Sequence, residues 1–203
     1  KNGIAKNKLT IEKDSRDTIG NAIYSKKIIL QKYSSVRKIV LITSDYHLKR
    51  ALISILKHQL ILDTTKESKD YPIAEIGFKM GLTVYRGSEN DVLDRYYNAA
   101  IESKADIIVR ITSDCPLIDP EVIDKIISAH IEHKKDFTSN VIHRTFPDGM
   151  DVEIFNLAAL EKAWKEAVSK ADREHVTYYI WKNSDLSGKN LFTAHNVETE
   201  DDL

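Results

Sequence analysis

The clearest chemical signal in this chain is an acid that directly follows an apolar run. Residues 107–111 read Ile-Ile-Val-Arg-Ile, and Asp114 follows within the segment Thr-Ser-Asp-Cys-Pro. In open α/β sheets, ligands bind beyond the carboxyl ends of the strands, and magnesium sites combine one or two carboxylates with phosphates and water. Asp114 is therefore a candidate ligand for a Mg²⁺ ion that carries nucleotide phosphates. From position alone, a cap of the turn before Pro116 is an equally good interpretation.

Two neighbours of Asp114 favour structural roles. Asp119 stands directly before Pro120, which places a carboxylate at the N-cap position and proline at the first position of a helix. This arrangement favours capping over catalysis. Cys115 is expected to be a packed small side chain, as most free cysteines are.

A second polar group surrounds a predicted turn. Pro147-Asp-Gly149 favours the turn, and residues 150–155 (MDVEIF) alternate apolar and acidic side chains as a strand does. A period of two places Asp151 and Glu153 on one face of that strand. The pair either contacts substrate or forms a solvated strand face, and position alone favours the solvated face slightly.

A third group stands at a predicted helix start, where Arg173, Glu174 and His175 follow one another. Arg173 offers a bidentate grip on a carboxylate or phosphate. Its alternative is a surface ion pair of small energetic value. His175 offers a substrate contact, but a structural histidine is favoured when the residue is considered by itself.

Alternating strands and helices must position these groups. The β-rich runs at residues 38–43, 60–64, 82–86 and 106–112 are each followed by a segment of helical length. This alternation of strand-like and helical segments predicts βαβ units and a parallel sheet. The nearly continuous apolar run at residues 107–111 predicts a central strand that is covered on both faces.

The pattern changes after the helix that is predicted to begin at Pro120. That helix carries a buried stripe at helical spacing, formed by Ile123, Ile126, Ile127 and His130. The strand at 150–155 and two helical stretches at 157–170 and 172–182 follow it. These elements predict an added lobe that faces the substrate.

Composition and charge exclude several classes of protein. The 203-residue chain is 42% hydrophobic, which is typical of a globular protein with a core. Its 30 Lys and Arg residues balance 31 Asp and Glu residues, so no global positive field attracts nucleic acid or an anionic membrane, and a small-molecule partner is favoured. No apolar run approaches the ~20 residues that span a bilayer. The single cysteine fits a reducing compartment and predicts a cytoplasmic protein, while the start at Lys1 without methionine leaves room for an upstream segment.

Four ordered motifs resemble the spore coat polysaccharide biosynthesis branch of the cytidylyltransferase family. They are residues 85–97 (YRGSENDVLDRYY), 110–120 (RITSDCPLIDP), 147–153 (PDGMDVE) and 173–177 (REHVT). The resemblance implies an α/β, Rossmann-like nucleotidyltransferase fold with a doubly wound, mostly parallel sheet. It also implies transfer of CMP from CTP to a sugar acid with release of pyrophosphate, with Mg²⁺ as cofactor.

The same resemblance implies roles for individual residues. Asp114 matches the family's magnesium-binding acid, and Glu198, within the closing segment VETEDDL, stands where the family has a second metal-binding aspartate. Glutamate reaches one methylene further, which makes tight magnesium geometry harder. The implied catalytic residues are Arg110, Asp114 and Arg173, and the implied substrate-binding residues are Arg95, Asn140, Asp151, Glu153, Glu174 and His175.

The beginning of the chain departs from this family. Family members open with a strand and a Gly/Arg-containing loop that cradles the triphosphate, and nothing in residues 1–60 matches them. The usual first strand and phosphate loop are therefore expected to be missing, unless they lie before Lys1. The predicted organisation is a foreign α/β segment at residues 1–60 and a cytidylyltransferase-like domain at residues 61–203.

The foreign segment resembles the carboxyl-terminal part of the YdcF-like envelope-biogenesis family. The resemblance rests on residues 12–22 (EKDSRDTIGNA) and 41–51 (LITSDYHLKRA). It implies an alternative ligand site formed by Ser44, His47 and Arg50, which would bind a small anionic or nucleotide-like ligand at a helix amino-terminus.

Three functions stay open at this point. The first is a sugar nucleotidyltransferase for surface or spore coat polysaccharide, or its inactive descendant, and the second is a YdcF-like binding module. The third is a non-catalytic hybrid in which residues 1–60 form a β-α-β-α unit that completes the sheet through the strand at 38–43. Without the glycine loop, nucleotide binding is expected to be weak and wholly Mg²⁺-dependent, unless Arg50 has taken over the phosphate grip. A homodimer and a monomer are equally compatible with the sequence.

Overall fold

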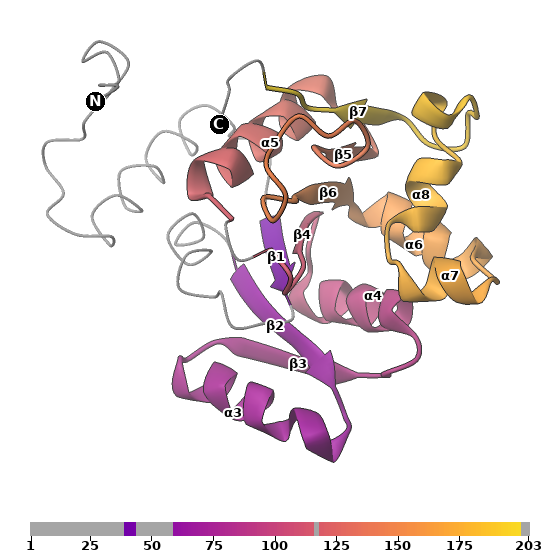
Figure 1. The fold of residues 1–203 in the computed structure, drawn as a ribbon. Helices are drawn as coiled ribbons and strands as arrows, with labels where there is room; N and C mark the ends of the chain where they lie inside the picture. Colours follow the sequence, from indigo (N-terminus) through magenta and orange to yellow (C-terminus); the bar gives the residue numbers. More distant parts are fainter. Residues whose placement is uncertain (1–38, 44–58, 116–117, 200–203) are drawn as a thin grey trace, which may run out of the picture.

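The computed structural model describes residues 39–43, 59–115 and 118–199, which form a seven-stranded sheet with helices packed on both faces (Figure 1). In the order in which they neighbour one another, the strands are β3 (Thr83–Gly87), β2 (Gln59–Thr65), β1 (Ile39–Thr43), β4 (Ile107–Ile111), β6 (Glu153–Asn156), β5 (Phe137–Ser139) and β7 (Ala194–Asn196). β4 therefore lies at the centre of the sheet, as its apolar run predicts.

Most of the strand pairs are parallel. β3, β2, β1 and β4 run in one direction, β6 is antiparallel to both β4 and β5, and β7 is parallel to β5. The carboxyl ends of β4, β5 and β7 consequently meet at one edge of the sheet, together with the amino end of β6. The prediction of an α/β fold with a mostly parallel sheet is confirmed.

The four strands predicted before residue 113 are all present, and their bounds differ by at most one residue from the predicted ones. β1 pairs in parallel with both β2 and β4, which confirms that the segment 38–43 joins the same sheet. Residues 1–38 and 44–58 lie outside the described residues. The rest of the β-α-β-α unit and the division at residue 60 therefore stay predictions.

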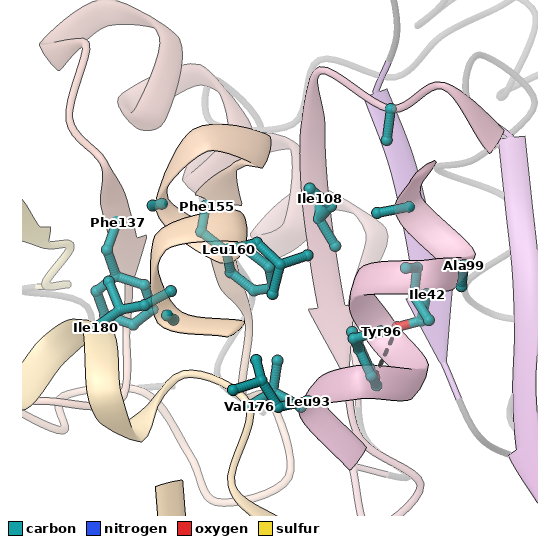
Figure 2. Packing of buried hydrophobic residues seen from close by; sticks show 14 of the residues in the cluster. Ile42, Leu93, Tyr96, Ala99, Ile108, Phe137, Phe155, Leu160, Val176 and Ile180 are labelled. Carbon is teal, nitrogen blue, oxygen red and sulfur yellow. Dashed lines mark hydrogen bonds between the residues drawn. The ribbon is translucent and has the colours of Figure 1, made fainter. Parts of the chain in front are cut away.

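Alternate strand residues bury two hydrophobic clusters, one on each face of the sheet. The first cluster combines Ile42, Ile61, Ile108, Phe137 and Phe155 from the strands with Leu93, Tyr96, Leu160, Val176 and Ile180 (Figure 2). The second combines Leu60, Leu62, Val109, Ile111 and Ile154 with Ile123, Ile126 and Ile127. Burying each side chain of this size stabilises the fold by about 1.5–3 kcal/mol. The two clusters therefore determine which residues of each strand face which layer of helices.

Local capping explains where the longer helices begin. The helices are α3 (Tyr71–Lys79), α4 (Val92–Ser103), α5 (Pro120–His133), α6 (Leu157–Glu166), α7 (Lys170–Glu174) and α8 (Tyr178–Lys182), with short 3₁₀ turns at Ser68–Asp70 and Asp185–Ser187. Asp119 accepts a hydrogen bond from the backbone N–H of Glu121 at 2.7 Å, which confirms its role as a helix cap.

No helix within the described ranges has the length and apolar character needed to cross a bilayer.

The second half of the chain differs from the predicted elements. β6 begins at Glu153 rather than at residue 150, and α6 ends at Glu166 rather than at residue 170. The stretch 172–182 is divided into α7 and α8, and Ser169 caps α7 by accepting a hydrogen bond from the backbone N–H of Asp172 at 3.2 Å. The prediction of a helix start at Asp172 is therefore wrong, because an uninterrupted helical pattern did not reveal the earlier serine cap.

The helices α6 and α8 do not form a lobe of their own. Leu160 of α6 and Ile180 of α8 belong to the same hydrophobic cluster as α4, so the second half of the chain shares one core with the first. The strands β5 and β7 were not predicted. Each has only three residues, which is too short for a period of two to stand out.

Burial of His130 on α5 predicts a pH-dependent stability. Its imidazole is 3% exposed, and its Nδ1 atom lies 3.0 Å from the hydroxyl oxygen of Thr138. Burial lowers the pKa of His130 from 6.5 to about 4, so the unfolded chain takes up a proton at a pH where the folded protein does not. The stability due to this group is complete above the unfolded pKa and is lost as the pH falls toward 4, by on the order of 3 kcal/mol.

We expect His130→Gln to remove this part of the pH dependence, because glutamine can bond to Thr138 but does not titrate. Urea denaturation of the parent and the variant from pH 7 to pH 4 measures the difference between their free energies of unfolding. Parallel pH profiles for the two proteins would contradict the expectation.

Candidate functional site

A cleft of about 230 Å³ opens at the carboxyl end of β4. It lies between β4 and the reversed strand β6, at the edge where α/β sheets bind their ligands. The lining comes from β4 and the turn after it, from the loop between β5 and β6, and from the start of β6, and it consists of Arg110, Thr112, Asp114, Val141, Arg144, Asp151 and Glu153. Four residues singled out in the sequence, Arg110, Asp114, Asp151 and Glu153, are thus brought together.

The cleft lies on the same face of the sheet as the first hydrophobic cluster, beyond the apolar core and towards the edge of the sheet. Ile108 of β4 lies in the first hydrophobic cluster, and Arg110, two residues further along, lines the cleft. In β6, Phe155 lies in the same cluster, and Glu153 lines the cleft. Because residues two apart share a face of a strand, the same rows change from apolar at the centre of the sheet to charged at its edge.

Arg110 and Glu153 form an ion pair on the floor of the cleft. They are directly opposite in the β4–β6 register, and Arg110 Nη1 donates to Glu153 Oε2. The other carboxylate oxygen accepts a hydrogen bond from Thr177 Oγ1 at 2.6 Å. Burial alone would lower the pKa of Arg110, but the neighbouring acidic groups, Glu153 first among them, together outweigh burial and raise this pKa. The positive charge of Arg110 is therefore a stable feature of the site.

Asp114 lies at the mouth of the cleft in the turn after β4. A hydrogen bond from the Thr112 side chain lowers the pKa of Asp114, and the nearby Arg110 guanidinium adds to this effect, so the carboxylate stays ionised. Among the carboxylates that line the cleft, Glu153 and Asp151 each have an arginine partner, whereas the described residues provide no ion pair for Asp114. Its exposed carboxylate is therefore available for a cation.

Cys115 occupies the packed position that was expected for it. The thiol side chain is 2% exposed and belongs to the second hydrophobic cluster. Its role is to anchor the turn that presents Asp114.

Arg144 reaches the cleft from the loop between β5 and β6. Its Nη1 and Nη2 atoms donate to Oδ1 and Oδ2 of Asp151, each at 3.0 Å, and Nη1 also lies 3.4 Å from Asp148 Oδ1. The sequence did not single out Arg144, because one arginine in a loop has no periodicity. Its place shortly before the Pro147-Asp-Gly149 turn was the one available signal.

Asn140 fixes the loop that carries Arg144. Its side-chain amide donates to the carbonyl oxygen of Met150 at 2.8 Å, and its carbonyl oxygen accepts from the backbone N–H of Val152 at 2.9 Å. The side chain is thus committed to closing the base of the loop. Asn140, which was predicted to bind substrate, is 2% exposed and does not line the cleft.

Asn196 at the end of β7 holds the other side of this loop. Its side-chain oxygen accepts hydrogen bonds from the backbone N–H groups of Ile142 and His143, each at 3.1 Å. Thr145 adds a contact, since its hydroxyl accepts from the backbone N–H of Thr199 at 2.9 Å. The loop is therefore tied on one side of Arg144 to β7 and on the other side to the segment that follows β7.

Glu198 lies at the same edge of the sheet but not among the cleft residues. Its Oε1 atom is 3.6 Å from Nδ1 of His143, and its side chain is 56% exposed. Two strands separate β4 from β7, so the ends of these strands are about 14 Å apart at ~4.8 Å per strand. No cluster of three or more acidic, histidine or cysteine residues suited to a metal ion occurs in the described ranges. A magnesium ion shared by Asp114 and Glu198 stays a prediction.

Arg173 binds another part of the protein rather than the cleft. Its Nε and Nη2 atoms donate to the carboxylate of Asp91 at distances between 2.6 and 3.1 Å, and its Nη1 atom donates to the carbonyl oxygen of Trp164 at 2.7 Å. Asp91 is also the N-cap of α4. Arg173 therefore joins the start of α4 to α6. Glu174 and His175 are exposed and do not line the cleft.

Arg95 likewise makes a structural ion pair. It is 7% exposed on α4, and its Nε atom donates to Oδ2 of Asp63 on β2 at 2.6 Å. Burial raises the pKa of Asp63 to about 7 even though Arg95 opposes this shift. Gly87 makes room for the arginine, because a Cβ atom at that position would lie 2.6 Å from Arg95 Cγ.

Comparison with known proteins identifies relatives over most of the chain. Residues 37–199 match the cytidylyltransferase family. An uncharacterized protein of Methanocaldococcus jannaschii is 42% identical over 156 residues, which cover 73% of this chain and 62% of that protein. The spore coat polysaccharide biosynthesis protein SpsF of Bacillus subtilis is 33% identical over 125 residues, which cover 61% of this chain and 51% of that protein. The chain thus spans less than two thirds of the length of these relatives.

Solved structures share the fold. A cytidylyltransferase from Leptospira borgpetersenii is 31% identical with a TM-score of 0.72, over 81% of this chain and 76% of that one. CMP:2-keto-3-deoxy-manno-octonic acid synthetase, solved in complex with CTP, has a TM-score of 0.52 at 11% identity, over 80% of this chain and 91% of that one. The fold is therefore the Rossmann-like nucleotidyltransferase fold that the motifs implied, and the second likeness shows the fold alone.

The comparisons do not support the YdcF-like resemblance of residues 1–60. The matched range begins at residue 37, so it includes β1, which lies next to the central strand β4. The alternative ligand residues Ser44, His47 and Arg50 lie outside the described residues.

The placement of Arg173 predicts a loss of stability when this residue is changed. Arg173→Ala removes the bidentate pair with Asp91 and the bond to Trp164, so we expect the free energy of unfolding to fall by about 2–3 kcal/mol. Urea denaturation measures this change, and Glu174→Ala is the matched control because its side chain is exposed. Unchanged stability together with lost activity would instead assign Arg173 to catalysis.

Proposed function

This chain belongs to the cytidylyltransferase family, and on that premise we propose that it transfers a cytidylyl group from CTP to the hydroxyl group of a sugar acid. The biological role we infer is activation of a sugar for surface or spore coat polysaccharide, which is supported by the similarity to SpsF. The single cysteine is compatible with a cytoplasmic reaction.

The observation that carries the proposal is the position of Asp114. An ionised, exposed carboxylate, which has no arginine partner among the described residues, stands beyond the carboxyl end of the central strand. Two arginines lie in the same cleft, each paired with another acid. Because no such arginine in the described part of the chain neutralises Asp114, its carboxylate is suited to bind a ligand that carries a positive charge, such as a nucleotide with a bound metal ion.

The charge of the cleft supports a magnesium-dependent reaction. Its lining holds two arginines and three carboxylates, which is a net charge of −1, so a free triphosphate is repelled. Mg²⁺ fits these residues, because it is commonly held by one or two carboxylates together with substrate phosphates. Once bound, the ion would neutralise phosphate charge and stabilise the charge that develops on the leaving pyrophosphate.

The protein's own contribution is positioning. The acceptor hydroxyl oxygen attacks the α-phosphorus of CTP, the bond from that phosphorus to the oxygen bridging the α- and β-phosphates breaks, pyrophosphate leaves with that oxygen, and the hydroxyl proton passes to solvent. Asp114 holds the nucleotide end of the cleft. Arg110, fixed by Glu153, adds an immobile positive charge on the floor, which needs no rearrangement as the transition state forms.

We expect the parent protein with CTP, Mg²⁺ and a panel of sugar acids to release pyrophosphate, and Asp114→Asn to lower the rate at least about 100-fold, the size of effect seen when one charge-stabilising group is lost. A chelator should abolish release. Asp119→Ser is the matched control, because serine keeps the helix cap. Release at the parental rate by Asp114→Asn would contradict the assignment, and no release with any nucleotide would favour the non-catalytic hybrid.

Direct binding gives a second test. Without a glycine loop that matches the family's, calorimetry should show weak CTP binding that requires Mg²⁺ and is lost in Asp114→Ala, since the carboxylates of the cleft repel the phosphates when no metal bridges them. Arg50→Ala should be titrated alongside. Micromolar binding that needs no Mg²⁺ and survives Asp114→Ala would show that another site is in use.

A further inference from the structure

The pairing of Arg144 with Asp151 is bidentate, which is more specific than the single contact of an ordinary surface ion pair. Both terminal nitrogens of the guanidinium donate to the two carboxylate oxygens at 3.0 Å. The pair nevertheless lines an open cleft, with side chains 53% and 28% exposed. Arg144 thus has both terminal nitrogens engaged at the edge of the sheet where ligands bind, and either stability or ligand binding must explain this pairing.

Stability does not supply that explanation. Ordinary exposed ion pairs are worth about 0–1 kcal/mol, and although bidentate geometry strengthens this pair, holding the long arginine side chain in one conformation costs entropy. The loop is also held without the pair, because Asn140 closes its base and Asn196 binds its backbone next to Arg144. The ion pair is therefore not needed to build the loop that carries it.

The geometry of the pair is that of a binding site already filled. An arginine fork binds a carboxylate through two parallel hydrogen bonds, and Asp151 supplies such a carboxylate from within the chain. The site adjoins the metal-binding end of the cleft, because the backbone of Asp151 hydrogen-bonds to Cys115, the residue after Asp114. An anion on Arg144 would lie beside a nucleotide bound at Asp114.

We propose that Arg144 binds the carboxylate of the acceptor sugar, and that Asp151 occupies the arginine fork until the acceptor arrives. This inference rests on the proposed function, since it assigns the acceptor end of the same cleft. The incoming carboxylate takes over the hydrogen bonds from Nη1 and Nη2. A neutral sugar has no group that can displace Asp151, so the exchange makes the site selective for acids.

The exchange predicts opposite effects for the two members of the pair. Removing Arg144 removes the acceptor's partner and weakens acid binding. Removing the charge of Asp151 removes the internal competitor. Arg144 is then more often free to bind the acceptor carboxylate, so acid binding becomes tighter. A pair with a merely structural role would weaken binding, or leave it unchanged, in both variants.

Calorimetry can test this with glucuronate and 2-keto-3-deoxy-octonate as probes, each beside its uncharged amide. We expect Arg144→Met to raise the Kd of the acids about 10- to 100-fold, the loss for a charge-assisted bond, and Asp151→Asn to lower it several-fold. Neither change should alter amide binding. The matched controls are Lys165→Met, which removes a similarly exposed cation (58% exposed), and Asp148→Asn, which removes an equal charge from the same loop but only the longer 3.4 Å contact to Arg144.

Several results would overturn the inference. Loss of CTP affinity in Arg144→Met without loss of acid affinity would assign the fork to a nucleotide phosphate. Equal effects of Asp151→Asn and Asp148→Asn, or no binding of either acid to the parent, would also exclude the exchange. Pyrophosphate release from CTP with a neutral sugar would overturn this inference while cytidylyl transfer itself stood, so the two failures are distinguishable.

Discussion

The ion pair of Arg110 and Glu153 is the interaction on which the arrangement of the cleft depends. It joins β4 to β6 where the strand direction reverses, and Thr177, just before α8, donates to the same carboxylate. The guanidinium lies 6.0 Å from the ring centre of Tyr96, whose hydroxyl donates to the carbonyl oxygen of Ile42 on β1. Breaking a buried pair by removing one partner typically costs about 3–5 kcal/mol, because the other charge is left uncompensated. The pair thus joins two strands to α4 and to the start of α8 where the apolar core ends.

The three carboxylates of the cleft differ in their partners, and this difference gives the site its character. Glu153 is buried and paired with Arg110, and Asp151 is paired with Arg144 in a half-exposed fork. Asp114 is exposed, and no arginine within the described ranges pairs with it. These three carboxylates lie in this order from the floor of the cleft to its mouth. A ligand that enters the cleft therefore first meets the carboxylates that can exchange partners. This gradient follows from the strand period of two, which carries the same rows of residues from the apolar core to the solvated edge.

The sequence predicted the sheet better than it predicted the site. Apolar runs and the Asp119-Pro120 cap are local signals, so β1 to β4 and the start of α5 could be placed from the sequence. The partners of polar residues are not local. Arg173 had the chemistry of an anion-binding residue, but Asp91 lies 82 positions away in the chain, and no local pattern connects the two. Arg144 was missed for the converse reason, since only the folded loop brings it to the cleft.

The most direct test is a crystal structure of the protein with CTP and Mn²⁺ in place of Mg²⁺, in which the metal can be located by its anomalous scattering. The cytidylyltransferase assignment predicts a metal peak bonded to the Asp114 carboxylate, with the triphosphate of CTP bound at the same end of the cleft. A nucleotide bound elsewhere, with no metal at Asp114, would contradict it.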